Sequence, residues 1–189
     1  MAIDTRTQIS EEAYERLALA EPDRKWELRD GVLREKPGMT AAHNSLEMQL
    51  GFMLMSQLDW SAYHVRIDSG RVRRPLSTYF IPDVFVVPTA YVIPLLEQHD
   101  VLEVYDRPLP LVVEVWSRST GEYDVEEKLA AYQQRGDLEI WRIHPYERTL
   151  TAWRRLPDGS YDETIHQEGV VSVAALPDVE INLAALFGD

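Results

Sequence analysis

The sequence contains no cysteine among its 189 residues. Disulfides, thiolate-bound zinc and cysteine nucleophiles are therefore excluded. No stretch approaches the roughly 18 apolar residues of a membrane span, and the N-terminus lacks the basic-then-apolar layout of a signal peptide. Glycine-rich phosphate loops, the nucleophile elbow of hydrolases and the His-Glu-x-x-His zinc motif are missing too. We expect a cytoplasmic protein without a membrane partner.

Basic residues are in the minority, with 19 Lys and Arg against 32 Asp and Glu and a net charge of −13. Phosphate binding relies on Lys and Arg, so this balance counts against a protein that coats nucleic acid. It leaves open an enzyme that touches nucleic acid locally, because a focused basic patch acts against an unfavourable overall field. Arg71, Arg73 and Arg74 form such a cluster, and we expect alternate members to face DNA.

Length and a 45% apolar composition favour a single globular domain over residues 1–189. Hydrophobic periodicity and turn residues alternate between helical and strand patterns, which indicates a mixed α/β (α+β) domain with helices flanking a mainly β centre. The patterns predict helices near 10–20, 40–58, 92–98, 123–135 and 182–187, and strands near 26–29, 32–35, 63–68, 70–76, 80–87, 111–116, 138–143 and 150–155.

Two acids interrupt runs that otherwise look like buried strands. Glu114 lies in the aliphatic run 108–116, and Asp83 lies in the apolar run 80–87. A carboxylate in such a run is costly to desolvate unless a positive group meets it. The alternatives are structural: Glu114 pairs with an arginine such as Arg142, and Asp83 bonds to local amides at a bulge.

A shared cation would explain both acids. Magnesium takes hard oxygen ligands, usually one or two carboxylates together with waters and substrate phosphate. Asp83 and Glu114 on neighbouring strands supply that minimum, and the backbone carbonyl of Val115 adds a third ligand. The sequence therefore predicts a Mg²⁺ or Mn²⁺ site. Two carboxyl groups crowded together without the ion should leave one with an anomalously high pKa.

Three further residues are candidates for this site. Lys128 lies at the border of a helical apolar stripe, where its stem can follow the sheet while its ammonium reaches a carboxylate. The alternative is a surface pair with Asp124 one turn earlier. Glu27, in the first hairpin, is either a third acid of the site or an ordinary exposed strand residue. His43 either bonds the start of the helix capped by Thr40 or points at a substrate phosphate.

Three segments of the chain, together with several shorter motifs, resemble a known family. They are Leu-Val-Val-Glu-Val-Trp-Ser-Arg-Ser-Thr (111–120), Tyr-Asp-Val-Glu-Glu-Lys-Leu-Ala-Ala-Tyr (123–132) and Gly-Asp-Leu-Glu-Ile-Trp-Arg-Ile-His-Pro (136–145). With the Trp-Glu-Leu-Arg-Asp-Gly hairpin, the Pro-Asp-Val motif and the closing Leu-Ala-Ala-Leu-Phe, they resemble the Uma-two family of putative restriction endonucleases, in the PD-(D/E)XK nuclease superfamily. The resemblance implies a restriction-endonuclease-like fold, with a central mixed sheet between helices, and a divalent-metal phosphodiesterase centre.

Residue by residue, the resemblance makes Asp83 the acid of the Pro-Asp motif and Glu114 the acid of the next strand. The superfamily pattern has a lysine two residues beyond that acid, where this chain has Trp116. The family resemblance implies that the lysine has moved to the following helix, as Lys128. Glu27 matches an early acid that some superfamily members use as a further ligand.

Two functions from different classes remain open. The first is a Mg²⁺-dependent DNA endonuclease, expected to be a homodimer because a twofold pair of sites readily cuts both strands. The second is a non-catalytic nucleic-acid or protein-binding module that retains the nuclease fold. The joint presence of Asp83, Glu114 and Lys128 favours the nuclease. Ile140-Trp141 and His144-Pro145 depart from the family's usual Tyr-Trp and Asp-Pro, which bears on substrate or partner contacts.

Overall fold

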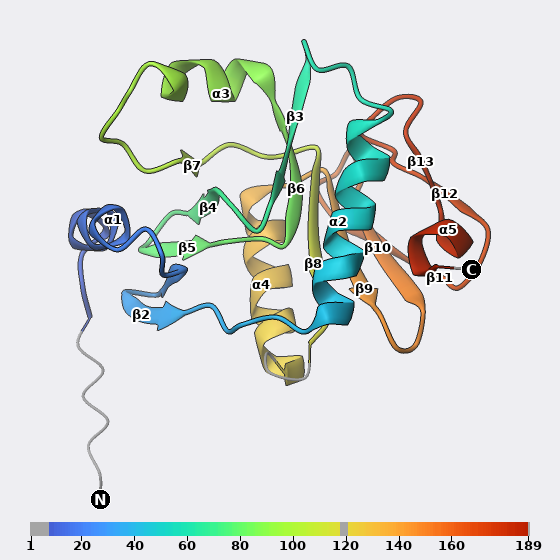
Figure 1. The fold of residues 1–189 in the computed structure, drawn as a ribbon, viewed down its shortest axis with the longest axis horizontal. Coiled ribbons are helices and arrows are strands. Elements are labelled where there is room, and N and C mark those ends of the chain that lie inside the picture. Colours follow the sequence, from blue (N-terminus) through green and yellow to red (C-terminus); the bar gives the residue numbers. More distant parts are fainter. Residues whose placement is uncertain (1–7, 118–120, 189) are drawn as a thin grey trace, which may run out of the picture.

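Helices lie on both sides of a central mixed sheet in the computed structural model of the chain (Figure 1). The structure describes residues 8–117 and 121–188, and the backbone alone for 121–125. The predicted fold class, a mixed α/β protein with a sheet between helices, is confirmed. Within the described residues no helix is long and apolar enough to cross a bilayer.

The central sheet has six strands in the order β11-β10-β9-β8-β6-β3. Its strands are β3 (Tyr63–Ile67), β6 (Val84–Pro88), β8 (Leu111–Val115), β9 (Glu139–His144), β10 (Thr149–Arg155) and β11 (Tyr161–His166). The pair β8–β9 is parallel and its neighbours are antiparallel, so the sheet is mixed. The two acid-bearing runs of the sequence therefore lie side by side, because β6 pairs with β8.

The described part of the chain contains five helices. They are α1 (Glu11–Ala20), α2 (Ala41–Met55), α3 (Thr89–Leu96), α4 (Gly121–Arg135) and α5 (Leu183–Phe187). Leu50 of α2 packs in a core with Val113 of the central sheet, whereas Tyr132 of α4 packs in a second core with Val112. Because successive strand side chains point to opposite faces, Glu114 shares the α4 face with Val112. The two helices thus cover opposite faces of β8 (Figure 1).

A second sheet has five strands in the order β2-β1-β5-β4-β7. Its strands are β1 (Trp26–Arg29), β2 (Val32–Glu35), β4 (Arg71–Arg74), β5 (Thr78–Phe80) and β7 (Val104–Tyr105). The Asp30-Gly31 turn joins β1 to β2 with φ angles of 46° and 81°, the left-handed region that tight hairpin turns require. The predicted hairpin is confirmed. A small third sheet pairs β12 (Val170–Ser172) with β13 (Glu180–Asn182).

The predicted strand over residues 80–87 is wrong in one respect, because two strands of different sheets occupy this stretch. β5 ends at Phe80 in the five-stranded sheet, and β6 begins at Val84 in the six-stranded sheet. Pro82 lies in the crossing and has no N–H to donate to a ladder, which explains the break. Asp83 is the last residue of this crossing, so its carboxylate stands where the two sheets meet.

Candidate metal and catalytic site

All six residues predicted for the site line one small cavity. The cavity has a volume of about 20 Å³, which is room for one water-sized particle. Its walls come from both sheets, from the segment after β2, from α2 and from α4. The six predicted residues that line the cavity are Glu27, His43, Asp83, Glu114, Val115 and Lys128. Segments far apart in the sequence therefore converge on one position.

Asp83 is buried and its carboxylate is fully engaged. Oδ1 lies 2.6 Å from the Lys36 ammonium, while Oδ2 accepts the Val115 backbone N–H at 2.6 Å and lies 3.2 Å from His43 Nε2. Burial raises the pKa of Asp83, but the charges of Lys36 and Lys128 and the His43 hydrogen bond outweigh burial and hold that pKa well below its usual range. Asp83 is thus a fixed anion beside the cavity.

Glu114 differs from Asp83 in that its carboxylate is bound by side chains of α4. Lys128 Nζ lies 3.2 and 3.3 Å from its two oxygens, and the Tyr132 hydroxyl donates to Oε1. Burial raises the pKa of Glu114 to about 7; Lys128 opposes this shift and the charge of Asp83 adds to it. Glu114 is therefore the acid of the pair with the raised pKa that was predicted, although burial is a larger cause of the shift than the nearby charge of Asp83. The predicted alternative partner, Arg142, has its guanidinium over the Trp153 ring, 5.2 Å from the centroid.

Lys128 is a buried bridge between two acids. Its side chain is only 5% exposed, and Nζ lies 3.1 Å from Glu27 Oε1 in addition to its contacts with Glu114. The same Glu27 oxygen accepts the backbone N–H of Ile81 at 2.9 Å, in the crossing between the sheets. The alternative partner Asp124 has a side chain outside the described ones. A solvated surface position for Lys128 is nevertheless excluded by its burial.

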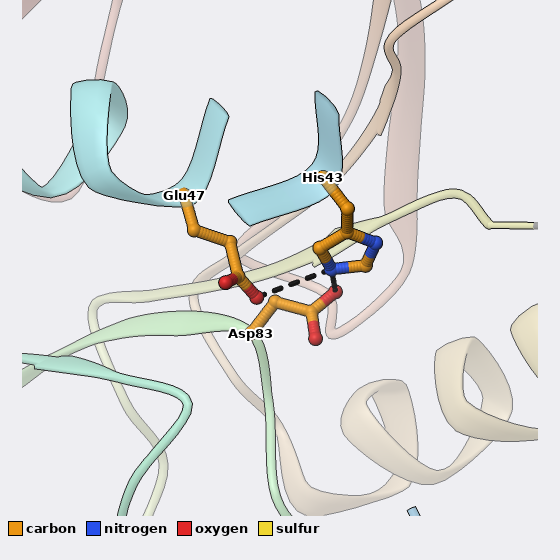
Figure 2. Close-up of side chains that lie close together, drawn as sticks. All are labelled: His43, Glu47 and Asp83. Carbon is orange, nitrogen blue, oxygen red and sulfur yellow. Dashed lines mark hydrogen bonds and ion pairs between the residues drawn. The ribbon is translucent and has the colours of Figure 1, made fainter. Parts of the chain in front are cut away.

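The first alternative for His43 is seen at its backbone, and its ring lies between two acids of the site. Its backbone N–H donates to Thr40 Oγ1 at 3.3 Å at the start of α2, and its ring reaches the site. Figure 2 shows Nε2 between the carboxylates of Glu47 and Asp83, at 3.1 and 3.2 Å. Burial lowers the pKa of His43, but the hydrogen bonds to both acids outweigh it and raise the pKa to about 9. The imidazole is thus a cation and a donor at neutral pH.

Three site residues were not predicted from the sequence: Lys36, Glu47 and Tyr132. Two of them had a usable signal, since Glu47 follows His43 by one helical turn and Tyr132 follows Lys128 by one turn, which places each on the same helix face as its partner. Lys36 follows β2 and meets an acid 47 residues away in sequence. No local sequence pattern predicts the contact between Lys36 and Asp83, because it depends on how the two sheets pack.

Two donor sets for a metal share Asp83. Candidate ligand atoms of His43, Glu47 and Asp83 lie within 4.8 Å of one another. However, Nε2 of that histidine is already held by both acids, and Glu47 is absent from the described residues that border the cavity. Asp83, Glu114 and Val115 all border it. Two carboxylic acids and a neighbouring backbone around an ion-sized cavity fit a hard divalent cation.

The arginine cluster of β4 is bound within the protein. Arg73 lies 2.7 Å from a carboxylate oxygen of Glu11, and Arg74 pairs with Asp30. Arg71 donates to a tyrosine hydroxyl of α1 at 2.9 Å. Guanidinium groups held this way connect the N-terminal helix and the β1–β2 turn to β4 of the five-stranded sheet. Their contacts count against the predicted DNA-facing role of this cluster.

Comparisons with known proteins agree with this architecture. The model of the Uma2 family, described as "Putative restriction endonuclease", matches residues 11–184. A crystal structure described as a putative nuclease belonging to DUF820, from Anabaena variabilis, superposes with a TM-score of 0.72 at 16% sequence identity, covering 86% of this chain and 89% of that chain. At that identity the likeness shows a shared fold. No curated protein matches the chain.

Proposed function

Because the chain belongs to the Uma2 family of putative restriction endonucleases, we propose that it is a divalent-metal-dependent nuclease hydrolysing phosphodiester bonds in DNA. One observation carries the proposal: Asp83, Glu114 and Lys128 meet at a single buried cavity of ionic size. Buried acids and a buried ammonium are costly to assemble, and such groups concentrate at functional sites.

The proposed ligands of the cation are Asp83, Glu114 and the carbonyl oxygen of Val115. Bound there, Mg²⁺ or Mn²⁺ would neutralise charge on the phosphoryl oxygens and supply an acidified water. Asp83 is ionised throughout the neutral range, whereas Glu114 with a pKa of about 7 must lose its proton first. The pair therefore provides one permanent anion and one that is adjusted by pH.

Lys128 is the proposed charge that faces the reacting phosphate. In hydrolysis a water oxygen bonds to phosphorus, the bond from phosphorus to one sugar oxygen breaks, and that oxygen leaves with a proton. An ammonium held between Glu27 and Glu114 at 3.1 and 3.2 Å is already oriented, so it stabilises the developing negative charge without reorganising.

His43, Glu47 and Lys36 are proposed as positioning residues. Each acts through Asp83: His43 and Lys36 bind its carboxylate directly, and Glu47 binds the same His43 nitrogen, Nε2, that faces Asp83. Outer partners of this kind fix the orientation of a metal ligand. Without them, of the contacts described above, only the Val115 backbone N–H would hold the Asp83 carboxylate in place.

A non-catalytic module with the same fold is the second candidate. The lysines favour it, since Lys36 and Lys128 already compensate the acids in the absence of any ion. The net charge of −13 favours it as well. The two candidates differ in one observable, which is turnover of a phosphodiester bond.

The deciding experiment is incubation with supercoiled plasmid and with circular single-stranded DNA, in Mg²⁺, in Mn²⁺ and in a chelator. The parent protein should cleave in the presence of the metals, and Asp83→Asn should not. Asp162→Asn, at an exposed position of β11, is the matched control and should cleave like the parent. Cleavage that survives in Asp83→Asn would show that this site does not carry the activity, and a parent without turnover would favour the binding module.

The expected homodimer belongs to the same proposal. A dimer with two sites linearises a plasmid in one encounter, whereas a monomer releases the nicked circle first. Light scattering of the purified protein gives the mass in solution, to be compared with 21.8 kDa for one chain. A monomeric mass together with nicked product would remove the dimer from the proposal.

A further inference from the structure

A second, larger groove lies beside the proposed catalytic cavity. It has a volume of about 620 Å³, the size of a small-molecule site. Its floor is the face of β9, β10 and β11 that carries Arg142, Thr149, Thr151 and Ile165. These side chains share one face, because Thr151 is directly opposite both Arg142 and Ile165 in the strand register.

Residues of the groove and of the cavity alternate along β8 and the segment after it, since Glu114, Val115 and Ser117 line the cavity and Trp116 lines the groove. Glu114 and Trp116 are two residues apart, so both side chains point to the α4 face, roughly 7 Å from each other along the strand. On the neighbouring parallel strand Arg142 is the register partner of Glu114, and His144 follows it by the same step. If one phosphate of a nucleic-acid strand lies at the cavity, the nucleotides that adjoin it therefore lie over Trp116 and the groove.

The rings of Trp116 and His144 line the groove, and Tyr146 lies against both of them. The rings of Trp116 and His144 stack, with centroids 4.3 Å apart and planes at 25°. Tyr146, 64% exposed, stands edge-on to both at 6.1 and 6.2 Å. The backbone N–H of Glu147 donates to Nδ1 of His144 at 3.0 Å, which fixes the orientation of the imidazole. An ordered set of rings at the surface offers flat apolar area without the cost of ordering it on binding.

The charges of the groove do not suit a phosphate backbone. Of the described residues that line it, one is an arginine, Arg142, and two are glutamates, Glu126 and Glu147. Phosphate tracks need an excess of Lys and Arg. Flat rings and threonine hydroxyls in a nearly neutral setting suit nucleobases, whose faces stack on aromatic side chains whatever their identity. The bases in a duplex are already stacked and paired, so only an unpaired strand presents them.

We propose that this groove binds the unpaired bases that flank the cleaved phosphate, stacking them on Trp116, His144 and Tyr146. The inference rests on the proposed nuclease function and narrows its substrate to single-stranded or locally unpaired DNA. The cavity binds the phosphate and the groove binds its neighbours, so recognition is by strand state and not by base sequence.

Binding is measured apart from cleavage, by fluorescence anisotropy in a chelator, with a labelled single-stranded oligonucleotide and with the same strand in a duplex. The parent should bind the single strand at least tenfold more tightly. Trp116→Leu should weaken that binding by about 5- to 150-fold, the range for the loss of one stacked base. The slope of affinity against salt should stay the same, because no phosphate contact is lost.

Two variants separate stacking from misfolding. Trp116→Tyr keeps a ring and should restore most of the affinity, whereas a merely structural role would leave both variants alike. Trp60→Leu removes another tryptophan, 57% exposed and just beyond α2, and should bind like the parent. Melting temperatures and circular dichroism check that each variant is folded.

The outcomes distinguish this inference from the nuclease proposal. Single-stranded RNA that binds as tightly as DNA supports stacking, since both offer the same base faces. Equal affinity for duplex, unchanged affinity in Trp116→Leu, or no binding to any nucleic acid overturns the groove assignment even where the plasmid is cleaved. Conversely, selective single-strand binding by a protein without turnover upholds the groove and removes the nuclease.

Discussion

Removal of the Lys128 ammonium is the sharpest perturbation of the site. In Lys128→Met the stem remains and the charge is lost, so Glu27 and Glu114 each lose a cation at 3.1–3.3 Å in a buried setting. Breaking a buried ion pair from one side costs about 3–5 kcal/mol. We expect the lower end, about 3 kcal/mol, because Tyr132 still donates to Glu114 and the Ile81 N–H still donates to Glu27.

This loss should depend on pH in a definite direction. Glu114 has a pKa of about 7 in the folded protein and an ordinary value of 4.5. A raised pKa means that the folded state holds the proton more tightly, so the contribution of Glu114 to stability is complete below pH 4.5 and disappears as pH rises through 7. Without Lys128 the pKa rises further. The deficit should therefore be smaller at pH 5, where Glu114 is protonated in both proteins, and larger at pH 8.

The assay is urea and thermal denaturation at pH 5 and pH 8. For a chain of this length, about 3 kcal/mol corresponds to a fall in Tm of about 6–12 °C at pH 8. Lys25→Met is the matched control, because Lys25 pairs with Asp68 at a half-exposed position and Asp68 keeps Lys36 at 2.8 Å. That variant should lose less than about 1 kcal/mol. A Lys128→Met protein as stable as the control, or equally destabilised at both pH values, would refute the reasoning.

Three other predictions concern the proposed metal site and the Arg73–Glu11 ion pair. Mg²⁺ or Mn²⁺ should raise the Tm of the parent in a thermal shift assay, because the ion binds only the folded site, and Asp83→Asn and Glu114→Gln should each abolish the rise. Mg²⁺ affinity, measured by calorimetry, should increase about tenfold from pH 6 to pH 8 as Glu114 loses its proton around pH 7, and an affinity independent of pH would exclude Glu114 as a ligand. Arg73→Glu places a second acid beside Glu11 and should cost roughly 1 kcal/mol in urea denaturation, while the salt slope of DNA binding stays that of the parent.

The two central acids could be found from the sequence because their signal is local. Glu114 stands in an aliphatic run and Asp83 follows Pro82 in another, so the cost of burying a charge is visible without any tertiary information. Lys128 was visible as a border position on a helix. For the two acids the pattern located the residue and its burial, whereas for Lys128 it left open whether the side chain is buried. In each case the partner remained one of several.

The partners could not be found, since they are set by packing. Whether Glu114 met Arg142 or Lys128 depended on where α4 crosses the sheet, a tertiary choice that periodicity does not encode. Lys36 reaches Asp83 only because the chain changes sheets between Phe80 and Val84. That crossing was itself missed, although a proline inside an apparent central strand is a warning sign.

The arrangement of cations has a consequence for how strongly the site can hold a metal. Lys36 and Lys128 compensate Asp83 and Glu114 within the folded chain, so the protein does not depend on an ion for its fold. An incoming cation gains less from acids that are already paired, and Mg²⁺ sheds its waters reluctantly. Affinity should then be modest. At a metal concentration of about ten times Kd the stabilisation is about 1.4 kcal/mol, a rise in Tm of about 3–6 °C. A rise above about 15 °C would mean that the lysines leave the acids when the metal binds.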